Sequence, residues 1–183
     1  MQFITNGENV KDLHGFFCCD NDFLGILSTD EDFLIEILYL FKDKLMLDPF
    51  TKIEFLREVY LPKQRLLKEQ IIAKAFIIAE SPNELVIKIM DDTLEISRIY
   101  AHQKRSGAGV VDLLLASRLK NIGYKAYLVT GNAKHFPSII FNTKAVINYE
   151  QNDGTMRAIS VIEFDRKKYQ EAEEKYARIE IKI

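Results

Sequence analysis

Three acidic residues and one carboxamide stand where α/β proteins place catalytic groups. Asp20 directly follows a short apolar run at residues 16–19, and Asn132 follows another apolar run. Glu54 lies in a predicted helix after a second apolar run, and Asp112 opens a further predicted helix behind two glycines. Functional residues of open α/β sheets gather beyond the carboxyl ends of the strands. If these four side chains meet there, one pocket holds three carboxylates and an amide.

This combination of side chains predicts a particular chemistry. Two bare carboxylates about 4 Å apart repel by roughly 4 kcal/mol at an effective dielectric constant near 20, so such a cluster persists when protons or a divalent cation neutralise it. Oxygen ligands suit Mg²⁺ or Mn²⁺ better than zinc. A cation held by Asp20, Glu54, Asp112 and Asn132 would activate water and stabilise charge on a phosphate group. The residues therefore indicate phosphodiester hydrolysis.

Strands and helices must alternate to position these residues, and the apolar pattern predicts that they do. Short continuous apolar runs are typical of buried strands, and apolar residues at helical spacing predict amphipathic helices. The segment 84–90 fits either a strand or a helix. We expect an α/β sandwich with a mainly parallel sheet. Strands are predicted at 16–19, 45–47 and 124–129, helices at 33–41, 51–60, 64–79, 92–100 and 110–120, a hairpin-like pair at 144–149 and 157–164, and a charged helix capped by Asp165.

Composition narrows the class of protein. The chain has 183 residues, 48% of them hydrophobic and 28% charged, with a formal charge of −2. Such a charge argues against coating nucleic acid through bulk positive charge, but leaves room for local basic contacts. No apolar run reaches the length of a membrane span, and the start lacks a signal-peptide pattern. Cys18 and Cys19 are adjacent, which predicts core packing and a reduced, cytoplasmic setting. We expect one domain over residues 1–183.

Four segments resemble the motifs of PIN domains, in the same order along the chain. Asp20-Asn21-Asp22 is similar to the Asp-(Ser or Thr)-Asn that ends their first strand, and residues 51–57 resemble their second motif, which carries Glu54. Residues 112–117 resemble the segment of the third acid, Asp112. Residues 130–137 resemble Thr-x-(Asp or Asn)-x-x-x-Phe, the most specific of the four. The resemblance covers roughly residues 16 to 150.

This resemblance implies a fold and a function. The fold would be a three-layer α/β/α sandwich with a mainly parallel central sheet, a core at about 16–150 and a C-terminal strand and charged helix at about 155–183. The function would be that of a Mg²⁺- or Mn²⁺-dependent endoribonuclease acting on single-stranded or structured RNA. Compact members include toxins silenced by an antitoxin protein. The resemblance assigns Asp20, Glu54, Asp112 and Asn132 to metal binding and catalysis, and Thr130 to orienting water or phosphate.

Partner binding is also predicted from the chain. The helices at 31–42 and 64–79 carry apolar stripes, and compact PIN proteins commonly dimerise, so we expect a homodimer or a bound partner. His135 with Lys134 could contact a phosphate group, although such loop residues are more often simply solvated. The segment 102–105 is basic and could steer RNA toward Asp112. No membrane partner is expected.

Each candidate residue also has a structural explanation. Thr51 and Glu54 fit a capping box, Asp112 could complement a helix dipole, and residues 130–132 could form only a tight turn. Asn132 stands where aspartate is commoner in PIN domains. A catalytically weakened PIN-like module that binds RNA or protein is therefore the alternative function. A phospho-acceptor receiver domain fits less well, because no aspartate follows the third predicted strand.

Overall fold

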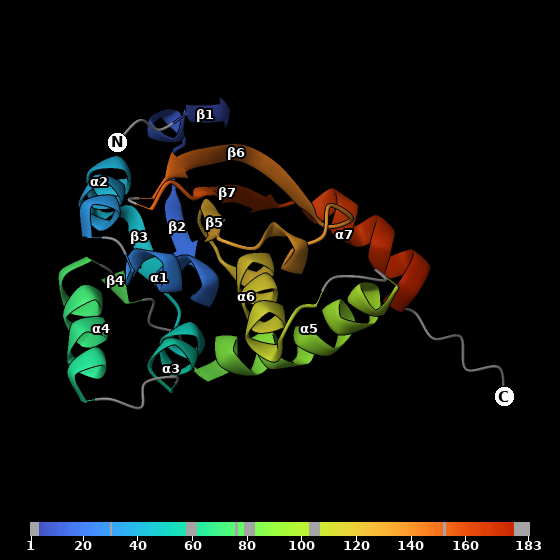
Figure 1. The fold of residues 1–183 in the computed structure, drawn as a ribbon. Coiled ribbons are helices and arrows are strands. Elements are labelled where there is room, and N and C mark those ends of the chain that lie inside the picture. Colours follow the sequence, from blue (N-terminus) through green and yellow to red (C-terminus); the bar gives the residue numbers. More distant parts are fainter. Residues whose placement is uncertain are drawn as a thin grey trace, which may run out of the picture.

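The structure of the protein is a computed structural model, and it describes residues 4–29, 31–57, 62–75, 77–78, 83–102, 107–151 and 153–177. A single sheet of seven strands runs through this part of the chain in the order β1-β6-β7-β5-β2-β3-β4 (Figure 1). The strands are β1 Ile4–Gly7, β2 Phe16–Cys19, β3 Leu45–Leu47, β4 Ile77–Ile78, β5 Ala126–Thr130, β6 Phe141–Glu150 and β7 Met156–Phe164.

The sheet is mixed. Strands β5, β2, β3 and β4 pair in parallel, whereas β1, β6, β7 and β5 pair in antiparallel fashion. The expectation of a mainly parallel sheet is therefore not confirmed. The reason is local: β6 and β7 are joined by a tight turn at Gly154, whose φ of 81° is in the left-handed region, and strands joined so closely can pair only antiparallel. The predicted hairpin-like pair at this turn is confirmed.

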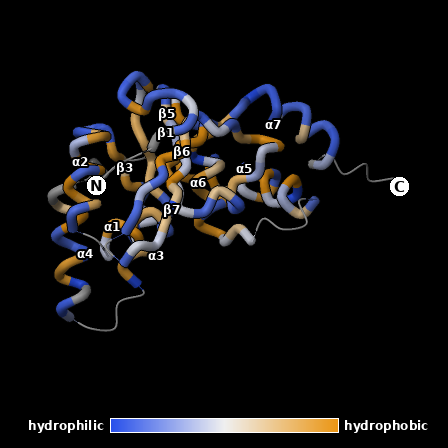
Figure 2. The backbone as a smooth tube through the Cα atoms, turned by 45° about the horizontal axis from the view of Figure 1, so that its top comes forward, coloured by the Kyte–Doolittle hydropathy of each residue, from blue (hydrophilic) through white to orange (hydrophobic). Residues whose placement is uncertain are grey.

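Seven α-helices surround the sheet within the described residues. They are α1 Asn21–Leu27, α2 Glu31–Phe41, α3 Pro49–Arg57, α4 Pro62–Ala75, α5 Asn83–Ala101, α6 Val110–Asn121 and α7 Arg166–Ala172. Helix α7 begins at its predicted cap, because the Asp165 carboxylate accepts hydrogen bonds from the N–H groups of Lys167 and Lys168. The short central strands β2, β3 and β5 are mostly hydrophobic, whereas α7 is largely hydrophilic (Figure 2).

Two apolar cores lie on opposite faces of the sheet. Alternate residues of a strand point to opposite faces, so Phe17 and Cys19 join the core beneath α1 and α2, while Cys18 joins the core beneath α5 and α6. Helices thus cover both faces, as in an α/β sandwich. Both cysteines are free and buried, which confirms their predicted role in core packing.

The chain departs from the sequence pattern in several places, among them α1, which was not predicted. The predicted helix at 64–79 ends at Ala75, and Ile77–Ile78 form β4 instead, paired with β3. The ambiguous segment 84–90 is helical and belongs to α5, which continues through the predicted helix at 92–100. Strand β1 was not predicted, and it pairs antiparallel with β6. No described helix combines the length and apolar character that spanning a membrane requires.

Candidate functional site

Asp20 lies at the carboxyl end of β2, in the middle of the parallel strands. The parallel register pairs Cys19 with Val129, so the residues that follow, Asp20 and Thr130, are neighbours. One carboxylate oxygen of Asp20, Oδ1, accepts a hydrogen bond from the N–H of Phe23 at 2.7 Å and caps α1. The other, Oδ2, accepts a hydrogen bond from the Thr130 hydroxyl. Both predicted residues therefore contact each other inside the protein.

Burial dominates the electrostatics of Asp20. Only 1% of the residue is exposed, and removal from water raises the pKa of its carboxyl from 3.8 to about 7. The hydrogen bonds from Thr130 and Phe23 oppose this rise, whereas the nearby charges of Asp22 and Asp112 add to it. Ionised Asp20 is therefore unfavourable by itself, and a cation beside it would lower its pKa.

Asp112 lies in the first turn of α6. Its Oδ2 atom accepts a hydrogen bond from the N–H of Gly109 at 2.8 Å. Asp112 therefore stabilises the start of α6, as its place in the first turn suggested. The same oxygen lies 3.1 Å from Nδ1 of His135. Burial raises the pKa of Asp112, while the hydrogen bonds from Gly109 and His135 lower it. Asp112 thus serves both the helix and a polar cluster.

His135 joins the remaining members of that cluster. It lies in a single 3₁₀ turn, Ala133–His135, directly after β5. Its Nδ1 atom is 3.7 Å from Oδ2 of Asp22, and its Nε2 atom is 3.0 Å from Nδ2 of Asn132. We refer to the polar residues joined here as the aspartate cluster, which comprises Asp20, Asp22, Asp112, Thr130, Asn132 and His135.

The turn between Thr130 and Asn132 is tightly packed. The N–H of Asn132 donates to the Thr130 hydroxyl oxygen at 2.9 Å. A Cβ at Gly131 would lie 2.7 Å from Cδ1 of Ile26 and 3.2 Å from the carbonyl carbon of Asp22. The glycine thus lets α1 lie close to this turn without displacing the Ile26 side chain. The tight-turn explanation is therefore correct as well, and the turn brings the cluster together.

Glu54 is half-buried in α3, the helix that follows β3. The predicted capping box is wrong, because α3 begins at Pro49 and places Thr51 inside the helix. The Thr51 hydroxyl has no hydrogen-bond partner among the described residues. Asp48 precedes α3 instead, and its Oδ1 accepts a hydrogen bond from the N–H of Phe50 at 2.9 Å.

Asp48 has a structural partner as well. Its Oδ2 lies 2.6 Å from Nε of Arg118, and both side chains are nearly inaccessible, at 3% and 4% exposure. This buried ion pair joins the start of α3 to α6, the helix that carries Asp112. The sequence offered no signal for it, since the partners are 70 residues apart.

The cluster fits a hard divalent cation in its chemistry. Its oxygen donors are three aspartates, a hydroxyl and a carboxamide, and such donors suit Mg²⁺ or Mn²⁺. The charge of Asp22 raises the pKa of both Asp20 and Asp112. The donors are not preassembled: within the described residues, no three His, Cys, Asp or Glu side chains form a group that could hold a metal ion. Hydrogen bonds to Phe23, Thr130, Gly109 and His135 occupy the aspartates instead.

No known protein family, curated protein or solved structure matches this chain. Function must therefore be inferred from the geometry of the aspartate cluster.

Tyr100 is a further polar residue that sequence reasoning missed. The residue is 4% exposed, and its hydroxyl has no hydrogen-bond partner among the described residues. Burial raises its pKa well above the ordinary value, and the charge of Asp112 adds to this rise. Tyr100 therefore places an uncharged hydroxyl on α5, within electrostatic range of Asp112.

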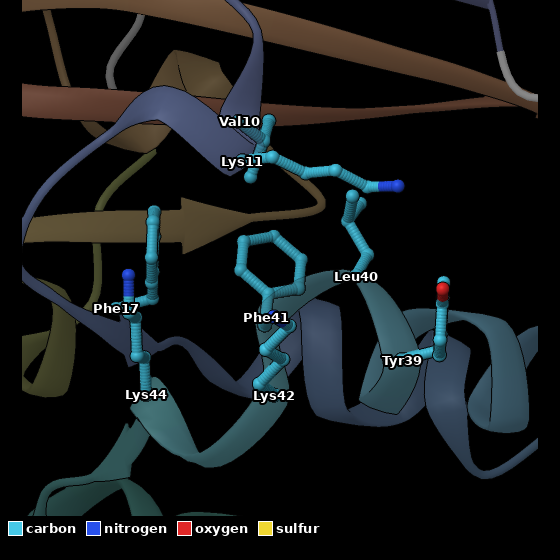
Figure 3. A pocket seen from close by; sticks show the side chains of 8 residues that line it. All are labelled: Val10, Lys11, Phe17, Tyr39, Leu40, Phe41, Lys42 and Lys44. Atoms are coloured by element: carbon cyan, nitrogen blue, oxygen red, sulfur yellow. The ribbon is translucent and has the colours of Figure 1, made fainter.

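A separate cavity of about 140 Å³ lies between the end of α2 and the start of β2 (Figure 3). Three lysines contribute to its wall, but two of them follow the C-terminus of α2, where basic side chains complement the helix dipole. The third, Lys11, lies with its ammonium group 5.4 Å from the centre of the Tyr39 ring. The cavity is lined by Val10, Lys11, Phe17, Tyr39, Leu40, Phe41, Lys42 and Lys44. Its basic character therefore has a structural explanation.

The two basic segments considered in the sequence have different outcomes. His102 stacks on Tyr176 with ring centres 4.6 Å apart, and residues 103–105 lie outside the described part of the chain. Lys134 is exposed beside His135. His135 itself is 23% exposed at its side chain, and its contacts place it within the cluster rather than in a solvated loop.

Proposed function

We propose that this protein is a PIN-like endoribonuclease that hydrolyses RNA phosphodiester bonds with Mg²⁺ or Mn²⁺. One observation carries the proposal: buried Asp20, hydrogen-bonded to Thr130 at the ends of two parallel strands, is electrostatically coupled to Asp22 and Asp112. The parallel strands β5-β2-β3-β4, covered by helices on both faces, support the three-layer α/β/α fold expected of such an enzyme.

Asp20 and Asp112 would hold the cation directly or through water, with Glu54 and Asn132 as the further ligands that the resemblance to PIN domains assigns. The bound cation would supply charge stabilisation at the phosphate and an activated water. The chain contributes orientation. Phe23 and Thr130 fix the two oxygens of Asp20, and Gly109 and His135 fix one oxygen of Asp112.

The substrate and partners follow from charge and apolar surface. A formal charge of −2 implies that single-stranded or structured RNA is held by local contacts near the cluster, such as exposed Lys134. Apolar residues remain exposed on three helices. They are Ile35 and Tyr39 on α2, Leu66 and Leu67 on α4, and Ile87, Met90 and Leu94 on α5. We propose that they support a homodimer or the docking of an antitoxin protein, which light scattering and pull-down would test.

A catalytically weakened RNA- or protein-binding module is the second candidate. The absence of a preassembled three-ligand group among the described residues favours it, as does the uncharged Asn132 at a position where aspartate is commoner in PIN domains. This module would bind RNA as tightly with EDTA as with Mn²⁺ and would not cleave it.

Cleavage of an unstructured fluorescent RNA, measured with Mn²⁺ and with EDTA, distinguishes the two candidates. We expect metal-dependent cleavage that falls by about two orders of magnitude or more in Asp20→Asn and Asp112→Asn. Asp91→Asn, on the exposed surface of α5, is the matched control and should retain activity. Full activity in both cluster variants would exclude the proposed site, and RNA binding without cleavage would support the binding module.

A further inference from the structure

His135 contacts two of the proposed ligands at once, through different ring nitrogens. Its Nδ1 atom is 3.1 Å from Oδ2 of Asp112, and its Nε2 atom is 3.0 Å from Nδ2 of Asn132. A carboxylate oxygen can only accept a hydrogen bond. The hydrogen of a neutral imidazole must therefore lie on Nδ1, which makes Asp112 the residue that selects the tautomer.

The selected tautomer determines the orientation of the neighbouring amide. With its hydrogen on Nδ1, the neutral ring presents a bare lone pair at Nε2, which can only accept a hydrogen bond. The Asn132 side chain must then turn its NH₂ group toward the ring. Its carbonyl oxygen, the only atom of an amide that suits a hard cation, faces away from the ring and accepts no hydrogen bond among the described residues.

We propose that His135 is a positioning residue: Asp112 fixes its tautomer, and the ring in turn fixes the Asn132 amide with its carbonyl oxygen available to a divalent cation or a phosphate-bound water. The value of that orientation for RNA cleavage rests on the proposed function. The hydrogen-bond relay itself is a property of the free protein.

The relay also accounts for a carboxamide at position 132. An aspartate there would offer only acceptors to Nε2, so its hydrogen bond to His135 would require a second proton on the ring. Asn132 supplies a donor to the Nε2 lone pair. The surroundings support a fixed ring: the side chains of Asp112 and His135 are only 13% and 23% exposed.

Nitrogen-15 NMR of the metal-free protein tests the relay without any reference to activity. We expect His135 to show a protonated Nδ1 and a bare Nε2 at neutral pH. Exposed His14 should show the averaged signals of an unrestrained ring. Asp112→Ala, which removes the acceptor, should abolish the preference of His135 for one tautomer, whereas Asn132→Ala should preserve it. A protonated Nε2 with a bare Nδ1, or averaged signals like those of His14, would overturn the proposal.

Variants of His135 test what the relay does for the site. Glutamine carries one donor and one acceptor and can bond to both Asp112 and Asn132, whereas leucine fills the space without either. We expect His135→Leu to weaken Mn²⁺ binding in calorimetry and to lower kcat, each by roughly 10- to 100-fold, with little change in KM. His135→Gln should recover most of both, and Asp91→Asn, on the exposed surface of α5, should match the wild type.

The outcomes separate this proposal from the proposed function. If the wild type cleaves no RNA but binds Mn²⁺ more tightly than His135→Leu, the ribonuclease proposal fails and the positioning role stands. If His135→Gln is as defective as His135→Leu in both metal binding and kcat while thermal unfolding shows that it is folded, the positioning role is wrong. Wild-type metal affinity and activity in His135→Leu would overturn it as well.

Discussion

The hydroxyl of Thr130 donates a hydrogen bond to the carboxylate of Asp20 and joins two adjacent parallel strands across 110 residues of sequence. The N–H of Asn132 donates to the same hydroxyl at 2.9 Å, so the oxygen of Thr130 both donates and accepts. Two hydrogen bonds therefore fix the Thr130 side chain, and Thr130 in turn fixes the orientation of the Asp20 carboxylate within the aspartate cluster. This relationship links the end of β2 to the turn that carries Asn132 and His135.

Asp20→Asn should stabilise the protein in mild alkali but not in acid. The folded pKa of Asp20, about 7, lies above its ordinary value of 3.8, so the folded state binds a proton that the unfolded state has lost between these values. The stability gained from this proton is complete below about pH 4 and is lost as the pH rises to about 7.

Asparagine cannot ionise, so the variant avoids the loss in the free energy of unfolding that ionisation of Asp20 causes, which is at most about 4 kcal/mol. The variant also loses one of the two hydrogen bonds that the Asp20 carboxylate accepts, which is worth about 1 kcal/mol. Urea unfolding at pH 8 should therefore show the variant to be more stable than the wild type by about 1 to 3 kcal/mol. At pH 4 the order should be reversed or the difference absent. Equal differences at both pH values would contradict the buried, proton-binding environment of Asp20.

Thr130→Val should shift the pH dependence of metal-dependent cleavage upward. The hydrogen bond from Thr130 lowers the pKa of Asp20, and valine removes the donor while keeping the shape of the side chain. Asp20 would then ionise at a higher pH, and Mn²⁺ binding would require a higher pH in turn. The midpoint of the pH–rate profile measures the effect, and Thr130→Ser should restore it. An unchanged midpoint in Thr130→Val would show that Asp20 does not control the rate.

Gly131→Ala should impair the site through crowding, although neither glycine nor alanine has a side chain that takes part in catalysis. The added Cβ would meet Cδ1 of Ile26 at 2.7 Å and the Asp22 backbone at 3.2 Å, so the Ile26 side chain must shift and the start of α1 must give by a few tenths of an ångström. We expect a loss of stability of about 1 to 3 kcal/mol and a lower rate of RNA cleavage. Gly25→Ala in α1 is the matched control, since no atom lies within 4 Å of its added Cβ and alanine favours the helix. A neutral Gly131→Ala would contradict the tight packing of this turn.

The sequence predicted those site residues whose position follows from an element boundary. Asp20, Asp112 and Asn132 each adjoin the end or start of a strongly patterned segment, and the structure places all three in the cluster. His135 could not be assigned, because its contacts with Asp22 and Asp112 depend on how three distant segments meet. Glu54 illustrates the reverse case: its spacing from Thr51 suggested a cap, but the helix begins earlier, at Pro49.

The sheet could be predicted only in part for a similar reason. Apolar runs identify strands, but the direction in which they pair depends on their connections. The tight turn at Gly154 forces β6 and β7 to pair antiparallel, whereas helical connections allow β2, β3 and β5 to pair in parallel. Strand β4 consists of only two residues, Ile77–Ile78, and such a short segment leaves no periodic pattern after a helix.

Breaking the ion pair between Asp48 and Arg118 should be among the most destabilising changes in the chain. Their side chains are 3% and 4% exposed, so removing one partner leaves the other charge buried. Arg118→Met should cost about 3 to 5 kcal/mol in the free energy of unfolding. Asp48→Asn should also destabilise, although asparagine can still accept the hydrogen bond from the N–H of Phe50 at the start of α3.

The double variant Asp48→Asn with Arg118→Met tests whether Asp48 and Arg118 stabilise the protein as an ion pair or through separate contacts. It leaves neither charge buried, so its destabilisation should be smaller than the sum of the single effects by about 1 to 3 kcal/mol. Urea unfolding of all four proteins in the cycle measures this difference. Since α6 carries both Arg118 and Asp112, RNA cleavage should fall in Arg118→Met and recover partly in the double variant. Additive losses would show that the ion pair does not couple α3 to α6.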